Sequence, residues 1–196
     1  MNAAPPKRRP RADALRNREA LIDAAKTVFE ESGAEASLEE IARRAGVGIG
    51  TLYRHFPTRD AMIEAVYRRE VDQLADAAER LLAERPPLEA LAAWMKLSVD
   101  YMATKKLIAP VLGTLSGGAS ALAALSGGRL TAALARLLEA GIAGGDIRAD
   151  VRMEDLMQVF GAFASGAAAP GWRESAFRLT DIIVAGLKAA PRAAGP

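Results

Sequence analysis

Four side chains that can donate or accept hydrogen bonds lie between residues 51 and 55. They are Thr51, Tyr53, Arg54 and His55. Hydroxyl, guanidinium and imidazole groups are the ones with which proteins contact phosphate oxygens and base edges in DNA. On a short helix these groups would occupy one outward face and the helix ends, and an ordinary helical hairpin rarely exposes such a set. The spacing therefore favours a contact surface for a nucleic acid.

Catalysis needs residues that this chain does not have. His55 is the only histidine, and cysteine is absent. A lone histidine cannot assemble a multi-histidine metal site or a convincing catalytic triad. The sequence also has no nucleophile elbow and no phosphate-binding glycine loop. We therefore expect no enzyme, no catalytic residue, no metal site and no cofactor. Without cysteine there is no disulfide framework, so we expect a cytoplasmic protein.

The segments around these side chains have the anatomy of a helix-turn-helix. Ser37 and Glu40 form a capping-box pattern at the start of a predicted helix 38–45. In this pattern Ser37 accepts from a first-turn amide, and Glu40 reaches back to the amide of Ser37. A turn containing glycine separates this helix from a second one, predicted over residues 49–56 and ended by Pro57.

The N-terminal end of the chain is basic. Its first 18 residues carry six basic side chains and one acidic side chain, which gives a net charge of +5. Surplus positive charge at one end favours binding to a polyanion, although a solvated tail is the alternative. Residues 1–14 contain three prolines and cannot bury a core, so we expect a disordered arm. Its arginines Arg8, Arg9 and Arg11 are candidates for DNA contact, and a first helix is predicted over residues 15–32.

The rest of the chain is predicted to be helical. Aromatic residues make up only 5% of the sequence, and alanine-rich segments with helical spacing recur along it. We predict an all-α protein of about nine helices, with a helix-turn-helix domain over residues 15–60 and a regulatory, ligand-binding and dimerisation domain over residues 61–196. The uncharged stretch 107–128 contains a proline and five glycines, so we expect two short helices and a loop rather than a membrane span.

Large soft side chains are concentrated in the larger domain. They either line an apolar cavity or fill the core, because methionine and aromatic residues serve both purposes. Polar groups that could orient a ligand are few, which points to an apolar or lightly polar small molecule. The candidate pocket residues are Trp94, Met95, Tyr101, Met102, Phe160 and Phe163.

The segment 159–169 carries no charge on any face of its predicted helix. A helix that is apolar all round must be buried, and its small residues permit close approach of another helix. Either a partner subunit covers one side in an isologous four-helix bundle, or the helix is central within one subunit. The candidate dimer residues on this helix and the last one are Phe160, Ala164, Ala167, Leu179, Ile183, Gly186 and Leu187.

Two runs of residues together resemble the signature of the tetracycline-repressor (TetR) family. Residues 37–47 read Ser-Leu-Glu-Glu-Ile-Ala-Arg-Arg-Ala-Gly-Val, and residues 50–57 read Gly-Thr-Leu-Tyr-Arg-His-Phe-Pro. The close resemblance spans about residues 15–65. It implies a homodimeric transcriptional regulator, usually a repressor, whose C-terminal domain binds a small molecule and thereby releases DNA.

The resemblance also implies roles for single residues. Tyr53 and His55 match positions that contact phosphates, Thr51 and Arg54 match positions that face the groove, and Arg59 matches a basic residue at the start of the fourth helix. Each of these side chains has a suitable hydrogen-bond donor.

Other positions in the motif are less typical of a base-reading surface. Ser37 matches a capping residue that can also meet a phosphate. Gly48 and Ile49 depart from the family pattern, in which many members have Ser and a polar residue, so a hydroxyl cap and one polar contact are missing. Arg43 and Arg44 are candidates for DNA attraction on a solvated face rather than for base reading.

The combined hypothesis is a ligand-released homodimeric repressor that binds double-stranded DNA at an inverted-repeat operator. The expected partners are this DNA, a second copy of the chain and a small-molecule effector, with no membrane. The alternative is a helical adaptor that binds a ligand or a protein and has no DNA activity; such a protein would need neither the basic arm nor the exposed polar set.

Overall fold

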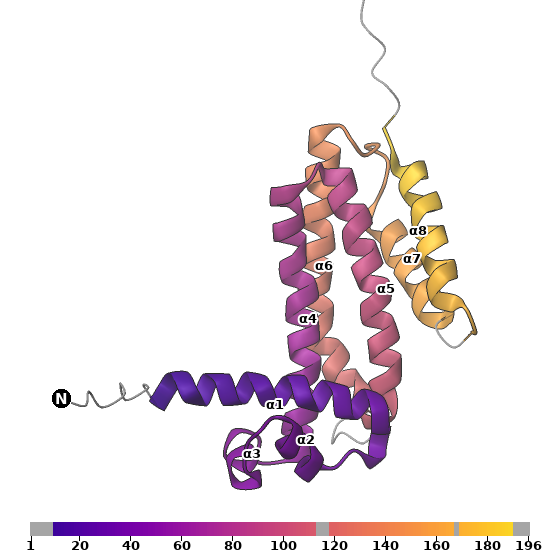
Figure 1. Cartoon of the computed structure of the whole chain (residues 1–196). Coiled ribbons are helices and arrows are strands. Elements are labelled where there is room, and N and C mark those ends of the chain that lie inside the picture. The colour runs from indigo at the N-terminus through magenta and orange to yellow at the C-terminus, as the bar shows by residue number, and fades with distance from the viewer. Residues whose placement is uncertain (1–9, 113–117, 167–168, 190–196) are drawn as a thin grey trace, which may run out of the picture. The chain divides into compact units, whose positions relative to one another are not determined.

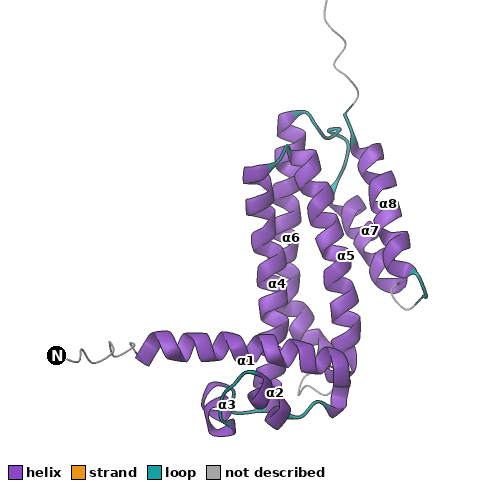
Figure 2. Cartoon of the chain, viewed as in Figure 1, coloured by secondary structure: helices purple, strands orange, loops and turns teal. Residues whose placement is uncertain are grey.

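A computed structural model describes residues 10–112, 118–166 and 169–189. Over these residues the chain forms eight α-helices and one short 3₁₀-helix, and the β structure is limited to an isolated bridge between Ile147 and Lys188 (Figures 1 and 2). The predicted all-α fold is confirmed, with one α-helix fewer than predicted. No helix in this described part of the chain is long and apolar enough to span a bilayer.

The chain divides into two compact units. The first contains the chain up to Tyr67 together with residues 107–119, and the second contains residues 68–106 and 120–196. In the first unit, α1 (Pro10–Ser32) packs against α2 (Leu38–Arg44) and α3 (Ile49–His55), with the 3₁₀-helix η1 (Gly33–Glu35) between α1 and α2 (Figure 1). The predicted helix-turn-helix lies in this unit.

The first helix begins earlier than predicted. The disordered arm was expected to reach residue 14, whereas α1 begins at Pro10. Proline is well suited to the first position of a helix, because its fixed φ is helical and the missing N–H would have no partner there. An ion pair between Arg16 and Asp13 supports the first turns, with Asp13 near the positive end of the helix dipole.

The second unit is a bundle built from the greater parts of α4 (Arg59–Glu84), α5 (Pro87–Leu112) and α6 (Gly118–Gly144), with α7 (Met153–Gly166) and α8 (Trp172–Leu187) (Figure 1). Its core combines apolar side chains of all five helices. Two buried polar groups in this unit have backbone partners: the indole Nε1 of Trp94 donates to the carbonyl of Leu74 at 2.8 Å, and the Thr180 hydroxyl donates to the carbonyl of Ala176 at 2.8 Å. Buried members of the core include Leu74, Leu91, Met95, Leu134, Leu137, Ile147, Leu156 and Leu187.

The uncharged stretch 107–128 is not two short helices. Its first residues complete the long helix α5, which continues through Pro110 to Leu112, and its later residues begin α6, which includes Gly127 and Gly128. A proline removes one helical hydrogen bond because it has no N–H, and each glycine weakens a helix by about 1 kcal/mol. The destabilisation by Pro110 and the glycines is therefore smaller than the stabilisation that the two long helices gain from packing.

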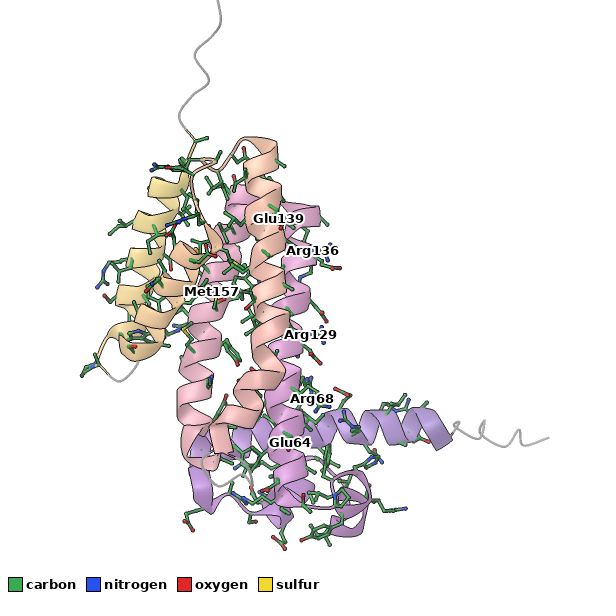
Figure 3. All side chains as sticks on the ribbon, turned by 180° about the vertical axis from the view of Figure 1, so that it is seen from behind. Glu64, Arg68, Arg129, Arg136, Glu139 and Met157 are labelled. Atoms are coloured by element: carbon green, nitrogen blue, oxygen red, sulfur yellow. The ribbon has the colours of Figure 1, made fainter. Side chains whose placement is uncertain are left out.

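Two contacts in the second unit fix neighbouring helices. A Cβ on Gly141 would lie 2.3 Å from Cδ1 of Ile147, so only glycine allows the segment after α6 to fold back over it. Arg129 of α6 pairs with Asp72 at 2.5 Å and with Asp76 at 3.1 Å, both on α4 (Figure 3 labels Arg129). These pairs are exposed and contribute little stability singly.

Candidate nucleic-acid interface

The start of α2 is held by a side-chain cap. Ser37 has extended backbone angles, and its hydroxyl oxygen accepts from the backbone N–H of Glu40 at 3.0 Å. This is the Ser37 half of the predicted capping box, and it satisfies one of the amides that a helix start leaves without a partner.

The other half of the capping box is replaced by ion pairs. Instead of reaching back to the Ser37 amide, the Glu40 carboxylate accepts from Arg43 at 2.8 and 2.7 Å and from Arg44 Nε at 2.7 Å. Hydrogen bonds from Arg43 and then Arg44 lower the pKa of Glu40 from its ordinary value of 4.5 to about 2. Two guanidinium groups one turn along the helix thus compete successfully for the carboxylate against a backbone amide.

Arg44 also joins α2 to α1. Its Nη2 lies 2.7 Å from Oε2 of Glu31, near the end of α1, while its Nε donates to Glu40. The hydrogen bond from Arg44 lowers the pKa of Glu31. Arg44 is therefore shared between two carboxylates of its own chain, which suits a positioning role more than a contact with DNA.

Two further arginines brace the first unit. Arg59, at the start of α4, donates to the carbonyl of Ala36, and its guanidinium carbon lies 5.5 Å from the ring centre of Phe29. Arg18 of α1 lies 5.3 Å from the ring centre of Phe56. Cations over aromatic faces stabilise such contacts, and here they link α1, the segment before α2, and α4.

The turn and the inner face of α3 follow the sequence prediction. Gly46 has φ +68°, a left-handed conformation that ends α2 and suits glycine. Leu52 and Phe56 are 0% and 2% exposed and form the core beneath α3. Thr58 caps α4 by accepting from the N–H of Ala61 at 3.1 Å. The opposite side of α3 is left open, with Tyr53 46% exposed.

Arg54 is held along its own helix. Its Nε donates to the carbonyl of Gly50 at 3.2 Å, and its Nη2 donates to the hydroxyl of Thr51 at 3.0 Å. These bonds use the side edge of the planar guanidinium, and its end edge, formed by Nη1 and the second Nη2 hydrogen, faces away from them. An end edge of this kind can donate two parallel hydrogen bonds to O6 and N7 of guanine.

The structure brings together part of the predicted contact set. Thr51, Tyr53, Arg54 and His55 share the short helix α3, with Tyr53 and Arg54 exposed and Thr51 and His55 half-buried. Arg43 and Arg44 lie on α2 and are engaged by carboxylates, and Arg59 is half-buried in its own brace. Arg8 and Arg9 lie outside the described residues, as does the side chain of Arg11.

Sequence reasoning missed one exposed residue on α3. Ile49 is 39% exposed at the first position of this helix, between Gly48 and Gly50. The signal was available, because a large apolar residue between two glycines is unusual at a helix start. The pairing of Arg44 with Glu31 was also missed, and no local spacing could have predicted it.

The predicted pocket residues of the second unit fill its core. Trp94 and Met95 are 3% and 0% exposed, and the ring of Trp94 meets that of Phe160 edge-on at 5.7 Å. Phe160 in turn meets Phe163 edge-on at 6.3 Å. Tyr101 and Met102 are half-buried against the same clusters.

An apolar cavity of about 450 Å³ lies between α7 and α8. Of the predicted pocket residues only Phe163 lines it, beside Trp172, Leu179 and Ile183. A Cβ on Gly166 would come within 3.0 Å of the Trp172 ring, so this glycine lets the indole close one end of the cavity. Two of the predicted dimer residues, Leu179 and Ile183, thus share the cavity wall.

Helices α7 and α8 leave uncharged stripes exposed. On α7 the stripe consists of Met157, Gly161 and Ala164, and Met157, which Figure 3 labels, is 45% exposed. On α8 it consists of Leu179, Ile182 and Gly186, with Leu179 44% and Ile182 66% exposed. Among the other predicted dimer residues, Phe160 and Ile183 are half-buried, Leu187 is buried in its own chain's core, and Ala167 lies outside the described residues. Exposed apolar side chains gathered on neighbouring helices are typical of interaction surfaces.

Two family models cover most of the chain. Residues 21–66 match the model described as bacterial regulatory proteins of the tetR family. Residues 86–189 match the model described as the C-terminal domain of SbtR-like transcriptional regulators.

Over the described residues no group of three or more acidic or histidine side chains could hold a metal ion.

Solved structures and curated relatives agree with these models. The TetR transcriptional regulator SCO0520 from Streptomyces coelicolor is 43% identical, with a TM-score of 0.79 over 89% of this chain and 99% of that one. A TetR regulatory protein from Mycobacterium vanbaalenii is 33% identical, with a TM-score of 0.74 over 91% and 99% of the two chains. A Staphylococcus aureus HTH-type transcriptional regulator, SAB2452, is 31% identical over 98 residues, and this match spans about half of each protein, 50% of this chain and 51% of the relative.

Proposed function

Because the chain belongs to the TetR family of transcriptional regulators, we propose that it binds an inverted-repeat DNA operator as a homodimer and is released by a small apolar ligand. The observation that carries this proposal is the outer side of α3. There Arg54 is fixed against Gly50 and Thr51, and Tyr53 stands exposed beside it.

Arg54 and Thr51 would face the major groove. A guanidinium that is already held by two hydrogen bonds loses little further conformational freedom on binding. Its end edge can therefore bind a guanine at a small cost in conformational entropy. Tyr53 and His55 would contact phosphates, with Ser37 at the start of α2. The arm arginines Arg8, Arg9 and Arg11 would add affinity without much specificity, because phosphates and the minor groove carry little sequence information.

The homodimer would form through the exposed stripes of α7 and α8. Two helices from each subunit would make a four-helix bundle in which Met157, Leu179 and Ile182 are buried. Small residues such as Gly161, Ala164 and Gly186 permit the helices to approach closely. Two-fold symmetry then presents two α3 helices to half-sites one helical turn apart, about 34–36 Å.

The ligand would be apolar or lightly polar, because the cavity between α7 and α8 is walled by Phe163, Trp172, Leu179 and Ile183. Helix α4 is continuous from Arg59 to Glu84 and belongs to both units, so it offers a physical link from the second unit to the helix-turn-helix. A ligand that prefers one arrangement of this link would change DNA affinity by about 5- to 150-fold. Regulation of this kind takes place in the cytoplasm.

Selection of bound fragments from genomic DNA, followed by gel-shift titration, tests the proposal. A duplex with both half-sites should bind sharply better than one in which a single half-site is scrambled at equal length. Equal binding to both duplexes would contradict dimeric operator recognition. Failure to enrich any sequence would favour a helical adaptor without DNA activity.

A further inference from the structure

Two glycines of α3 have no local reason to be glycine. Gly48, the residue before the helix, has φ −73° and ψ 150°, which any residue can adopt. Gly50 lies within the helix and has no positive φ. A Cβ built on either residue meets no atom within 4 Å, so neither packing nor backbone conformation requires its absence. Glycine inside a seven-residue helix lowers the stability of that helix.

An exposed apolar side chain stands between these glycines. Ile49 is 39% exposed, and Tyr53 one turn later is 46% exposed. Gly48 and Gly50, the residues on either side of Ile49 in the sequence, add no side chain around it. The outer side of α3 therefore offers a branched hydrocarbon group beside the held guanidinium of Arg54.

We propose that Ile49 is a specificity-determining residue that contacts the C5-methyl group of a thymine in the major groove, and that Gly48 and Gly50 allow the close approach. This inference rests on the proposed function, in which α3 enters that groove. Thymine is the one DNA base that presents a methyl group there, and apolar side chains recognise it by contact. The glycines leave the space that such a contact needs, because bulkier neighbours would hold the helix away from the base edges.

The thymine contact is tested by removing one methyl group from the DNA. An operator is selected with the full chain from a pool of random duplexes, and each thymine is then replaced by deoxyuridine, which differs only by that methyl. Loss of one buried methyl weakens binding about fourfold per half-site, or about fifteenfold for symmetric replacement in both. The loss is expected at one thymine of each half-site, in the wild-type protein.

Variants of Ile49 test the same thymine contact from the protein side. Ile49→Ala should bind the thymine and uracil operators within twofold of each other, whereas Ile49→Val, which keeps branched methyl groups, should retain a preference for thymine. Leu15→Ala, which shortens an apolar side chain that is 65% exposed on α1, is the matched control and should keep the full uracil effect. If the uracil effect is the same in wild type and Ile49→Ala, the inference is wrong while the operator binding still stands. If no sequence is enriched from the pool, the proposed function itself fails.

The close approach is tested by adding one carbon atom. Gly48→Ala and Gly50→Ala should each weaken operator binding at least about fivefold, the scale of one lost base-pair contact. The melting temperature should not fall, and for Gly50→Ala it should rise by up to about 2–4 °C. Gly128→Ala in α6, also exposed with no atom within 4 Å of its Cβ, is the control and should leave operator binding unchanged. Operator binding equal to wild type in both α3 variants would overturn the proposal.

Discussion

The outer side of α3 and the exposed stripes of α7 and α8 are both open surfaces, but they differ in chemistry. Around α3 the arginines of the first unit are largely engaged within the chain: Arg44 by Glu31 and Glu40, and Arg59 by Ala36 and Phe29. On α3 itself the side chains of Tyr53 and Arg54 are exposed. On α7 and α8 the exposed stripes carry no charge at all. The chemistry of each surface therefore depends on which charged side chains are paired within the chain as well as on which are exposed.

This difference predicts opposite partners, a charged polymer for α3 and a second apolar surface for α7 and α8.

Ile182→Asp should have the largest effect. Ile182 is 66% exposed in one chain, so aspartate there leaves the subunit folded, but it would place an unpaired carboxylate inside the proposed four-helix bundle. We expect a monomer by sedimentation and an operator affinity lower by about 10²- to 10⁴-fold, since the second half-site is no longer held at high effective concentration. Gln73→Asp adds the same charge at an exposed position of α4 and should remain dimeric. A dimer of unchanged stability for Ile182→Asp would move the interface elsewhere.

Arg54→Ala should have the next largest effect, with the dimer intact. Removal of a two-bond contact to guanine costs about 1–3 kcal/mol, or about 5- to 150-fold for each half-site, and relaxes the preference at that base pair. Arg43→Ala removes the same charge from α2, where the guanidinium is paired with Glu40, and should change operator affinity only a few-fold. Titration against operators with single base changes measures both. Equal losses of operator affinity for the two variants would show that the ion pair with Glu40 does not prevent Arg43 from contacting DNA.

The contrast between these arginines shows what sequence could and could not predict. The helix-turn-helix limits followed from local signals: the Ser37 cap, the left-handed Gly46 and Pro57 each act on adjacent residues. The partners of the arginines did not follow. Arg44 and Glu31, or Arg59 and Ala36, are far apart in sequence and meet only because α1, α2 and α4 pack together.

Two errors came from treating breaker residues as decisive. Pro10 begins α1 instead of belonging to a disordered arm, and Pro110 lies inside the last turn of α5. At Pro10 the local cost of proline is small, because the first N–H groups of a helix have no intrahelical partner in any case. At Pro110 one helical hydrogen bond is lost, and the packing of α5 outweighs that loss. The pocket residues Trp94 and Phe160 stay a prediction, because their side chains have the chemistry of a ligand site and of a core, and their edge-on contact is compatible with both.

The Gly141→Ala variant tests whether packing requires glycine at this position of α6. Its Cβ would lie 2.3 Å from Ile147 Cδ1, and the overlap should cost about 1–3 kcal/mol of unfolding free energy. A melting temperature lower by about 2–4 °C for each kcal/mol is expected, measured by circular dichroism. Gly128→Ala, in the same helix with open space around it, should be neutral or stabilising. A drop in melting temperature as large for Gly128→Ala would mean that helix propensity and packing are not the cause.

The smallest effect concerns Glu40, whose pKa is lowered to about 2 in the folded protein by Arg43 and Arg44. A carboxylate with a lowered folded pKa adds stability that is complete above its unfolded pKa, near 4.5, and is lost as pH falls through the folded value. The urea midpoint of wild type should therefore exceed that of Glu40→Gln by a constant amount at neutral pH, and the difference should shrink between about pH 4.5 and pH 2. Because these groups are exposed, the difference should also decrease with salt. Glu39→Gln on the same turn controls for the loss of one charge from α2. If the Glu40→Gln difference stayed constant down to pH 2, the carboxylate of Glu40 would not be what holds Arg43 and Arg44 in place.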